Sequence, residues 1–182
     1  MRKLTLIAVV LVLVFVAGSG GAAPPKELEP VAFLVGQWGT VGTATGAPGG
    51  GTGSATFAWG LQDQVMIRTS YAEYPATASA PASRHDDLMV IYAAAAGGLR
   101  ADYYDNEGHD IHYAVTTPAP GQASFVSDAV SGAPQFRLTY ALGADGLLKG
   151  EFAIAPPDKP GTFSPYLTWE SRKVAPRAKH GK

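Results

Sequence analysis

The stretch "VAFLVGQWGTVGTATG", residues 31–46, changes from one kind of structure to another within a few residues. Together with the residues before it, it has a one-sided apolar stripe over residues 27–35, and Pro30 suits the first turn of a helix. Gly36 is a typical helix end, and the Gly- and Thr-rich run after Trp38 has low helix propensity. The stretch therefore predicts a short helix over residues 27–35 that leads straight into a strand.

Everything after this stretch has the pattern of strands and turns. Short runs of alternating polar and apolar residues recur at a spacing of about ten residues, with Gly-, Pro-, Asn- and Asp-rich turns between them. The predicted strands cover residues 38–45, 52–59, 64–74, 87–94, 99–104, 109–117, 122–128, 135–142, 147–155 and 163–174. Because no helix-period segment separates them, parallel βαβ units are excluded and neighbouring strands should pair antiparallel. A closed sheet removes both exposed edges, so we predict an all-β fold, an up-and-down antiparallel barrel of about ten strands closed by a short N-terminal helix.

The alternation also predicts which side chains face the interior. Apolar and aromatic residues alternate with polar ones, which indicates strands with one buried face. We expect a ligand to be bound by the aromatic residues of that face, namely Trp59, Tyr71, Tyr92, Tyr113, Tyr140, Phe152 and Trp169. In residues 64–74 the odd positions are predicted to face inward and Arg68 outward. If the faces were reversed, Arg68, Arg137 or His112 would reach a ligand's head group.

The N-terminus has the layout of a secretory signal peptide. Two basic residues precede an unbroken apolar run that is too short to span a bilayer comfortably, and small residues follow. We predict a signal peptide over residues 1–22, one barrel domain over residues 23–174 and a flexible basic tail over residues 175–182. The alternative is an uncleaved anchor. The protein is accordingly expected to be periplasmic or extracellular, with no membrane attachment after cleavage.

Composition narrows the class of protein further. The 182 residues carry a formal net charge of −1 and include no cysteine. The absence of a basic excess argues against a nucleic-acid partner. Without disulfides the chain depends on burial, and a domain of about 160 residues can bury roughly two-thirds of its unfolded surface. We expect a monomer or a homodimer.

A short helix followed by Gly36-Gln37-Trp38 at the start of an antiparallel barrel resembles the calycin superfamily, which includes lipocalins, fatty-acid-binding proteins and nitrobindin-like barrels. The strand count and the N-terminal helix are most similar to the nitrobindin and fatty-acid-binding side. The run "YYDNEGHDIHYAV" at residues 103–115 is also similar to exported bacterial barrels of unknown function. In this superfamily the Trp packs at the closed end beneath a basic residue of the last strand. The resemblance implies that Gly36, Trp38 and Arg172 close the barrel, with a cation–π contact between the last two.

The resemblance also bears on cofactors. Nitrobindin-like proteins bind haem through a His on the final strand, but residues 164–174 contain no His, and Tyr166 or Thr168 falls nearest that place. We therefore expect no haem and no other cofactor. Fatty-acid-binding barrels use an interior Arg to bind a carboxylate, which the predicted alternation does not provide here.

Sequence patterns for metal binding or catalysis are weak. His109 and His112 should point to opposite faces of a strand, so no metal site is expected. For catalysis, the candidates for a cavity-facing acid or base are Asp102, His109 and Glu170. We predict an exported barrel that binds a small apolar molecule without catalysis. The alternatives are an enzyme, such as an isomerase, cyclase or hydrolase, that uses the same cavity, and a structural or interaction domain with a filled core.

Overall fold

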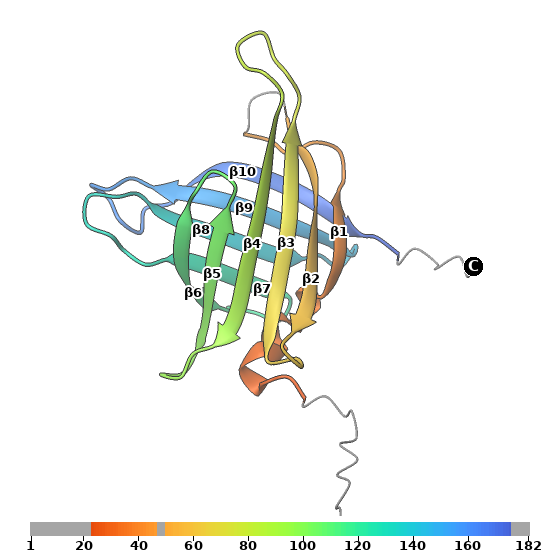
Figure 1. Cartoon of the computed structure of the whole chain (residues 1–182), viewed down its shortest axis with the longest axis vertical. Helices are drawn as coiled ribbons and strands as arrows, with labels where there is room; N and C mark the ends of the chain where they lie inside the picture. Colours follow the sequence, from red (N-terminus) through yellow and green to blue (C-terminus); the bar gives the residue numbers. More distant parts are fainter. Residues whose placement is uncertain (1–22, 47–49, 176–182) are drawn as a thin grey trace, which may run out of the picture.

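The computed structural model describes residues 23–46 and 50–175 (Figure 1). The predicted signal peptide and residues 176–182 of the predicted tail lie outside the described residues. The described elements are the 3₁₀ helix η1 (Lys26–Leu34) and the strands β1 (Gly36–Thr40), β2 (Thr52–Gly60), β3 (Val65–Tyr74), β4 (Ser83–Ala93), β5 (Leu99–Asp105), β6 (Asp110–Thr116), β7 (Gln122–Ser127), β8 (Gln135–Leu142), β9 (Leu147–Ala155) and β10 (Ser164–Lys173).

The strands form a closed antiparallel barrel in which each strand pairs with its sequence neighbour, and β1 closes the ring against β10. The predicted fold class is therefore confirmed. Figure 1 shows η1 at one end of the barrel and the loop between β3 and β4 projecting at the opposite end. We call these the helix end and the loop end. Within the described residues, no helix is both long enough and apolar enough to span a membrane.

Two strand boundaries differ from the prediction. β1 ends at Thr40, and of the residues predicted to continue it only Thr45 returns to the sheet, through an isolated bridge to Thr168. β4 begins at Ser83, where it pairs with Tyr74, so the β3–β4 ladder is longer than predicted. The added residues 83–86 are polar and lack the alternating pattern, and they are strand because each pairs with a residue of β3.

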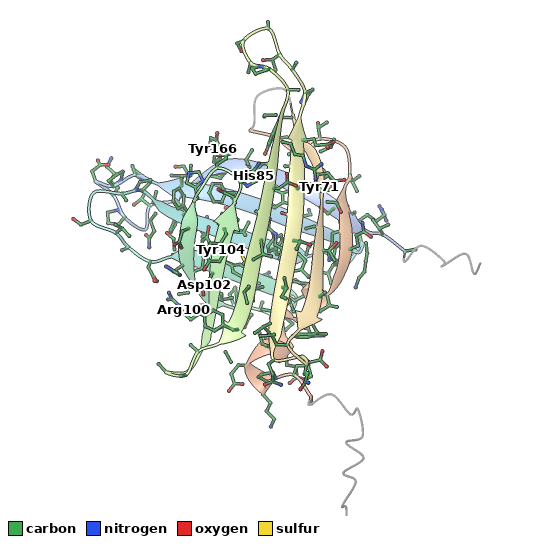
Figure 2. All side chains as sticks on the ribbon, viewed as in Figure 1. Tyr71, His85, Arg100, Asp102, Tyr104 and Tyr166 are labelled. Carbon is green, nitrogen blue, oxygen red and sulfur yellow. The ribbon has the colours of Figure 1, made fainter. Side chains whose placement is uncertain are left out.

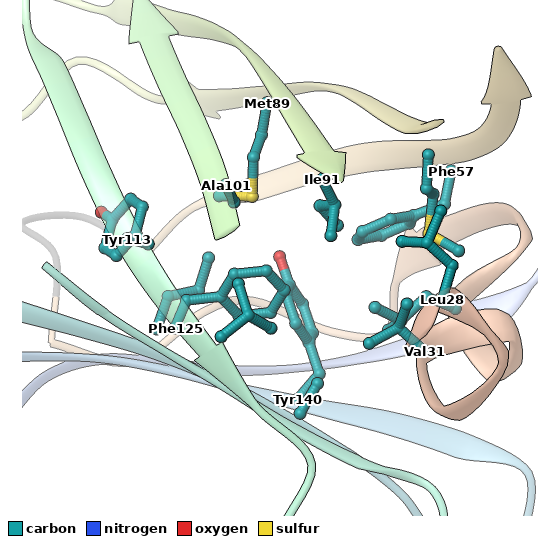
Figure 3. Close-up of a cluster of buried hydrophobic side chains, with 14 of the residues drawn as sticks. Leu28, Val31, Phe57, Met89, Ile91, Ala101, Tyr113, Phe125 and Tyr140 are labelled. Atoms are coloured by element: carbon teal, nitrogen blue, oxygen red, sulfur yellow. The ribbon is translucent and has the colours of Figure 1, made fainter. Parts of the chain in front are cut away.

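The helix end is filled by an apolar cluster, which we call the floor (Figure 3). Its members are 0–3% exposed: Leu28, Val31, Leu34, Trp38, Phe57, Met66 and Ile91. The Trp38 indole donates a hydrogen bond from Nε1 to the Leu34 carbonyl oxygen at 2.7 Å. This bond satisfies one of the carbonyl groups that a helix leaves unpaired at its C-terminus. Trp38 therefore joins η1 to the barrel by both packing and hydrogen bonding.

The closing residues differ from the prediction at one position. Gly36 has φ of +133°, a value that favours glycine, so the sharp turn from helix into strand is as expected. However, Lys173 and not Arg172 lies over Trp38, with Nζ 5.3 Å from the ring centroid. Trp38 is directly opposite Lys173 in the β1–β10 ladder, whereas Arg172 is opposite Gly39. A register difference of one residue moves a side chain to the other face of the sheet, which explains the correction.

Candidate functional site

A cavity of about 590 Å³ lies in the other half of the barrel, between the floor and the loop end. This volume is within the usual range for small-molecule sites. None of the floor residues lines it, whereas the loops before Thr52, after Tyr74 and after Asp105 all contribute to its rim. The barrel is therefore filled at the helix end and hollow toward the loop end, and a filled core is not what the structure shows.

One side of the cavity, which we call the apolar wall, comes from β8, β9 and β10. Its side chains are Phe136, Leu138, Phe152, Ile154 and Trp169. Phe136 and Phe152 stack with ring centroids 5.7 Å apart. Gly150 lies directly beneath the Trp169 indole, where any Cβ would collide with the ring. The apolar wall is thus a continuous surface suited to an apolar ligand.

Tyr113 of β6 and Tyr140 of β8 form the base of the cavity, because they line it and also belong to the buried core. Both rings make edge-on contacts with Phe125, with centroids 6.4 Å and 6.2 Å away. Figure 3 shows Tyr140 extending from its strand into the centre of the buried cluster. Burial raises the pKa of both phenols, so both hydroxyls stay protonated and can donate hydrogen bonds.

The opposite side, the polar wall, comes from β3, β4 and β5. Its side chains are Arg68, Ser70, His85, Asp87, Tyr103 and Asp105. Arg68 donates from Nη2 to Ser70 Oγ at 2.8 Å and to Asp87 Oδ2 at 3.3 Å. Ser70 in turn donates to Asp87 Oδ2 at 2.5 Å. The Arg68 and Asp87 side chains are only 10% and 5% exposed, so the cavity contains a nearly buried ion pair.

A second network lies closer to the loop end, where Figure 2 labels His85. His85 Nε2 is 2.8 Å from the Tyr103 hydroxyl and its Nδ1 is 3.0 Å from Glu107 Oε1. Tyr103 also donates to Asp105 Oδ2 at 3.2 Å. Burial, followed by the charges of Asp87 and Asp105, raises the pKa of Tyr103, which keeps this phenol protonated as well.

Asp105 organises the turn after β5. Its Oδ1 accepts the backbone N–H groups of Glu107 and His109, each at 2.9 Å, and its Oδ2 lies 2.8 Å from His109 Nδ1. Burial opposes ionisation, but the hydrogen bonds from His109 and Glu107 outweigh it and hold the pKa of Asp105 below its usual value. Asp105 is therefore an ionised, fully bonded carboxylate at the rim.

The predicted ligand-binding residues separate into three groups. Tyr113, Tyr140, Phe152 and Trp169 line the cavity. Trp59 packs against the core without lining the cavity. Tyr71 and Tyr92 were assigned to the wrong face. Tyr71 reaches the cavity rim, but it is 37% exposed and its ring is covered by Arg84 at 4.1 Å, while Tyr92 lies on the outer face beside the buried Ile91.

The error on β3 has a physical cause. Val65 and Ile67 on the outer face are as apolar as Met66 on the inner face, so alternation alone could not choose between them. The structure decides through the neighbouring strands, because Arg68 is directly opposite Phe57 on one side and Met89 on the other. Cross-strand partners share a face, and both partners are buried inside the barrel. Arg68, predicted to face solvent, is therefore inside.

The catalytic candidates also divide between the two faces. Asp102 is on the outer face, 2.7 Å from His112 Nδ1, and Glu170 is also outside, 3.6 Å from Lys149 Nζ (Figure 2 labels Asp102). His109 alone of the three lines the cavity.

Sequence reasoning missed His85, Asp87 and Tyr103 as cavity residues. One available signal was the run "HDDLMVIYA" at residues 85–93, a strongly apolar strand that begins with charges. Among the described residues, no group of three or more His, Cys, Asp or Glu side chains is arranged to hold a metal ion.

The fold and the cavity define a class of protein: a closed ten-stranded antiparallel β-barrel with an interior compatible with ligand binding. No protein-family model matches the chain, and no curated protein sequence matches it.

Proposed function

We propose that this protein is an exported, calycin-like barrel that binds one small apolar or amphipathic molecule without catalysis. The cavity of about 590 Å³ carries the proposal, because a barrel that served only as a rigid domain would gain stability from filling that volume. The apolar wall supplies the surface for the body of the ligand. The polar wall and the two base tyrosines supply hydrogen-bonding groups for a polar end.

Three features support the calycin-like assignment. The barrel is closed, antiparallel and sequentially connected, as the resemblance implies. A short helix followed by Gly36 and Trp38 fills one end. A basic residue of the last strand, Lys173, covers the Trp38 ring.

Export is supported by the sequence. Residues 1–22 have the charged, apolar and small-residue regions of a secretory signal peptide, in that order. We therefore propose that the mature protein acts in the periplasm or outside the cell, as a monomer or a homodimer. In either compartment the protein could bind a ligand that has not entered the cytoplasm.

Mass spectrometry of the mature protein from its native host tests the proposal. A larger mass under native than under denaturing conditions would reveal a bound molecule. In Ala55→Phe, which places a ring in the cavity, the mass difference should disappear. Ala58→Phe, on the outer face of the same strand, should retain it. Equal native and denatured masses, together with no thermal stabilisation by any apolar compound, would contradict the proposal.

An enzyme that uses the same cavity is a second candidate, favoured by the Glu107–His85–Tyr103 network at the rim. A carboxylate that holds one imidazole nitrogen while the other faces a phenol is an arrangement suited to proton transfer. Incubating the bound molecule with the protein would distinguish the two functions. Conversion by the wild type that is lost in His85→Gln would show an enzyme, and an unchanged molecule would favour the carrier.

A further inference from the structure

The electrostatics of the polar wall narrow the class of ligand, provided that the proposed binding function holds. The charged residues that line the cavity, among those described, are one guanidinium, three carboxylates and two imidazoles: Arg68, Asp87, Asp105, Glu107, His85 and His109. A cavity lining with one permanent cation and three carboxylates has no positive excess. An anionic ligand therefore finds no net attraction in this cavity.

The arrangement of the carboxylates strengthens this conclusion. Asp87 and Asp105 are directly opposite each other in the β4–β5 ladder, on the inner face. Asp87 is also the ion-pair partner of Arg68, 3.3 Å from Nη2. A ligand carboxylate bound by Arg68 would lie within a few ångström of the Asp87 carboxylate. In a site of low dielectric constant, repulsion from Asp87 would offset the attraction of Arg68.

The same wall has spare capacity for a neutral polar group. Arg68 uses Nη2 for both of its side-chain hydrogen bonds, and its buried Nε has no partner among the described residues. Asp87 Oδ1 is likewise without a partner there. Tyr113 and Tyr140 line the same cavity, and the Arg68 guanidinium carbon is 6.0 Å from the Tyr140 ring centroid. Donors and a carboxylate acceptor are thus adjacent at the base of the cavity.

We infer that the ligand is an uncharged amphipathic molecule whose polar end is a hydroxyl or an amide, bound beside Arg68, Tyr113 and Tyr140. Its apolar body lies along Phe136, Phe152 and Trp169. A hydroxyl or amide accepts a hydrogen bond from Arg68 or a phenol and donates one to Asp87. A carboxylate of the same chain can only accept, and it meets the charge of Asp87.

Three probes with the same chain test the inference: decanol, decanamide and decanoate. Their affinities for the full mature protein are measured by displacement of a fluorescent naphthalene dye at about pH 8, where decanoate is ionised. We expect decanol and decanamide to bind at least tenfold more tightly than decanoate. Asp87→Asn removes the repelling charge and should raise decanoate affinity about tenfold. Asp102→Asn, the same change on the outer face of the neighbouring strand β5, should leave all three affinities unchanged.

Each other outcome is decisive. Tightest binding of decanoate by the wild type would overturn the inference and make Arg68 a carboxylate receptor. Binding of the dye without displacement by any probe would also overturn it while leaving a binding cavity in place. Failure of the folded protein to bind even the dye would contradict the proposed function itself. If Asp87→Asn does not fold, Tyr140→Phe replaces it, with an expected loss of decanol and decanamide affinity and unchanged dye affinity.

Discussion

The two ends of this barrel are built from the same alternating strands, but one end is filled with apolar side chains and the other encloses a cavity. At the helix end, η1 inserts Leu28, Val31 and Leu34 among inward-facing side chains, and no space remains for a ligand. Toward the loop end, no helix of the described residues enters, and the inward-facing side chains enclose about 590 Å³. We infer that the floor supplies most of the stabilising burial, so the cavity can carry polar groups that would be costly in a filled core.

The largest loss of stability is expected when a tryptophan of the filled half is removed, compared with a tryptophan of the hollow half. Trp38→Ala should lower the free energy of unfolding by about 3–5 kcal/mol, because it removes a 3% exposed ring and its bond to Leu34. Trp169→Ala should cost roughly half as much, since that ring already borders empty space. Urea denaturation monitored by far-UV circular dichroism measures both. Equal losses would contradict the division into a filled and a hollow half.

The next largest change in stability is expected when the Arg68–Asp87 ion pair of the polar wall is broken. Arg68→Met leaves Asp87 buried without its cation and should destabilise the protein by about 3 kcal/mol. The double variant Arg68→Met with Asp87→Leu replaces the pair by apolar groups and should recover most of that loss. Thermal and urea unfolding of both variants measure the recovery. A double variant as unstable as the single one would show that the pair itself supports the barrel.

A smaller loss of stability is expected when the Asp105 carboxylate at the cavity rim is changed. Because the folded-state pKa of Asp105 is below its unfolded value, the stability from its ionised form is present above about pH 4 and is lost as pH falls through the folded pKa. Asp105→Asn should therefore cost about 1–2 kcal/mol at pH 7 and progressively less below pH 4. Asp158→Asn in an exposed turn is the matched control. A loss that does not change with pH would refute this origin.

The smallest effect is expected on the outer face, where neither half is disturbed. The hydrogen bond that His112 donates to the Asp102 carboxylate raises the pKa of His112, so this pair adds stability below about pH 6.5 and loses it as pH rises through the folded pKa. The His112 side chain is 53% exposed, which limits the contribution to no more than about 0.5 kcal/mol. Stability of His112→Gln and wild type, compared at pH 5.5 and pH 8.5, measures it. A larger loss at pH 8.5 would contradict the assignment.

Local sequence features were enough to predict the architecture. Period-two alternation, turn residues and the absence of helix-period segments are local features, and they sufficed for ten sequentially paired strands in a closed barrel. They also placed Tyr113, Tyr140, Phe152 and Trp169 on the inner face, because a charged or polar residue precedes or follows each of them in its strand.

The polar wall and the closing contact depend on contacts between strands, which local sequence features do not reveal. On β3 both faces are apolar, so the inward position of Arg68 depends on its cross-strand partners Phe57 and Met89. Likewise Lys173, not Arg172, covers Trp38 because of the register between β1 and β10. Register between strands is set by contacts distant in sequence, and a shift of one residue exchanges inside for outside. The alternating pattern therefore predicted the barrel but not the groups that line its polar side.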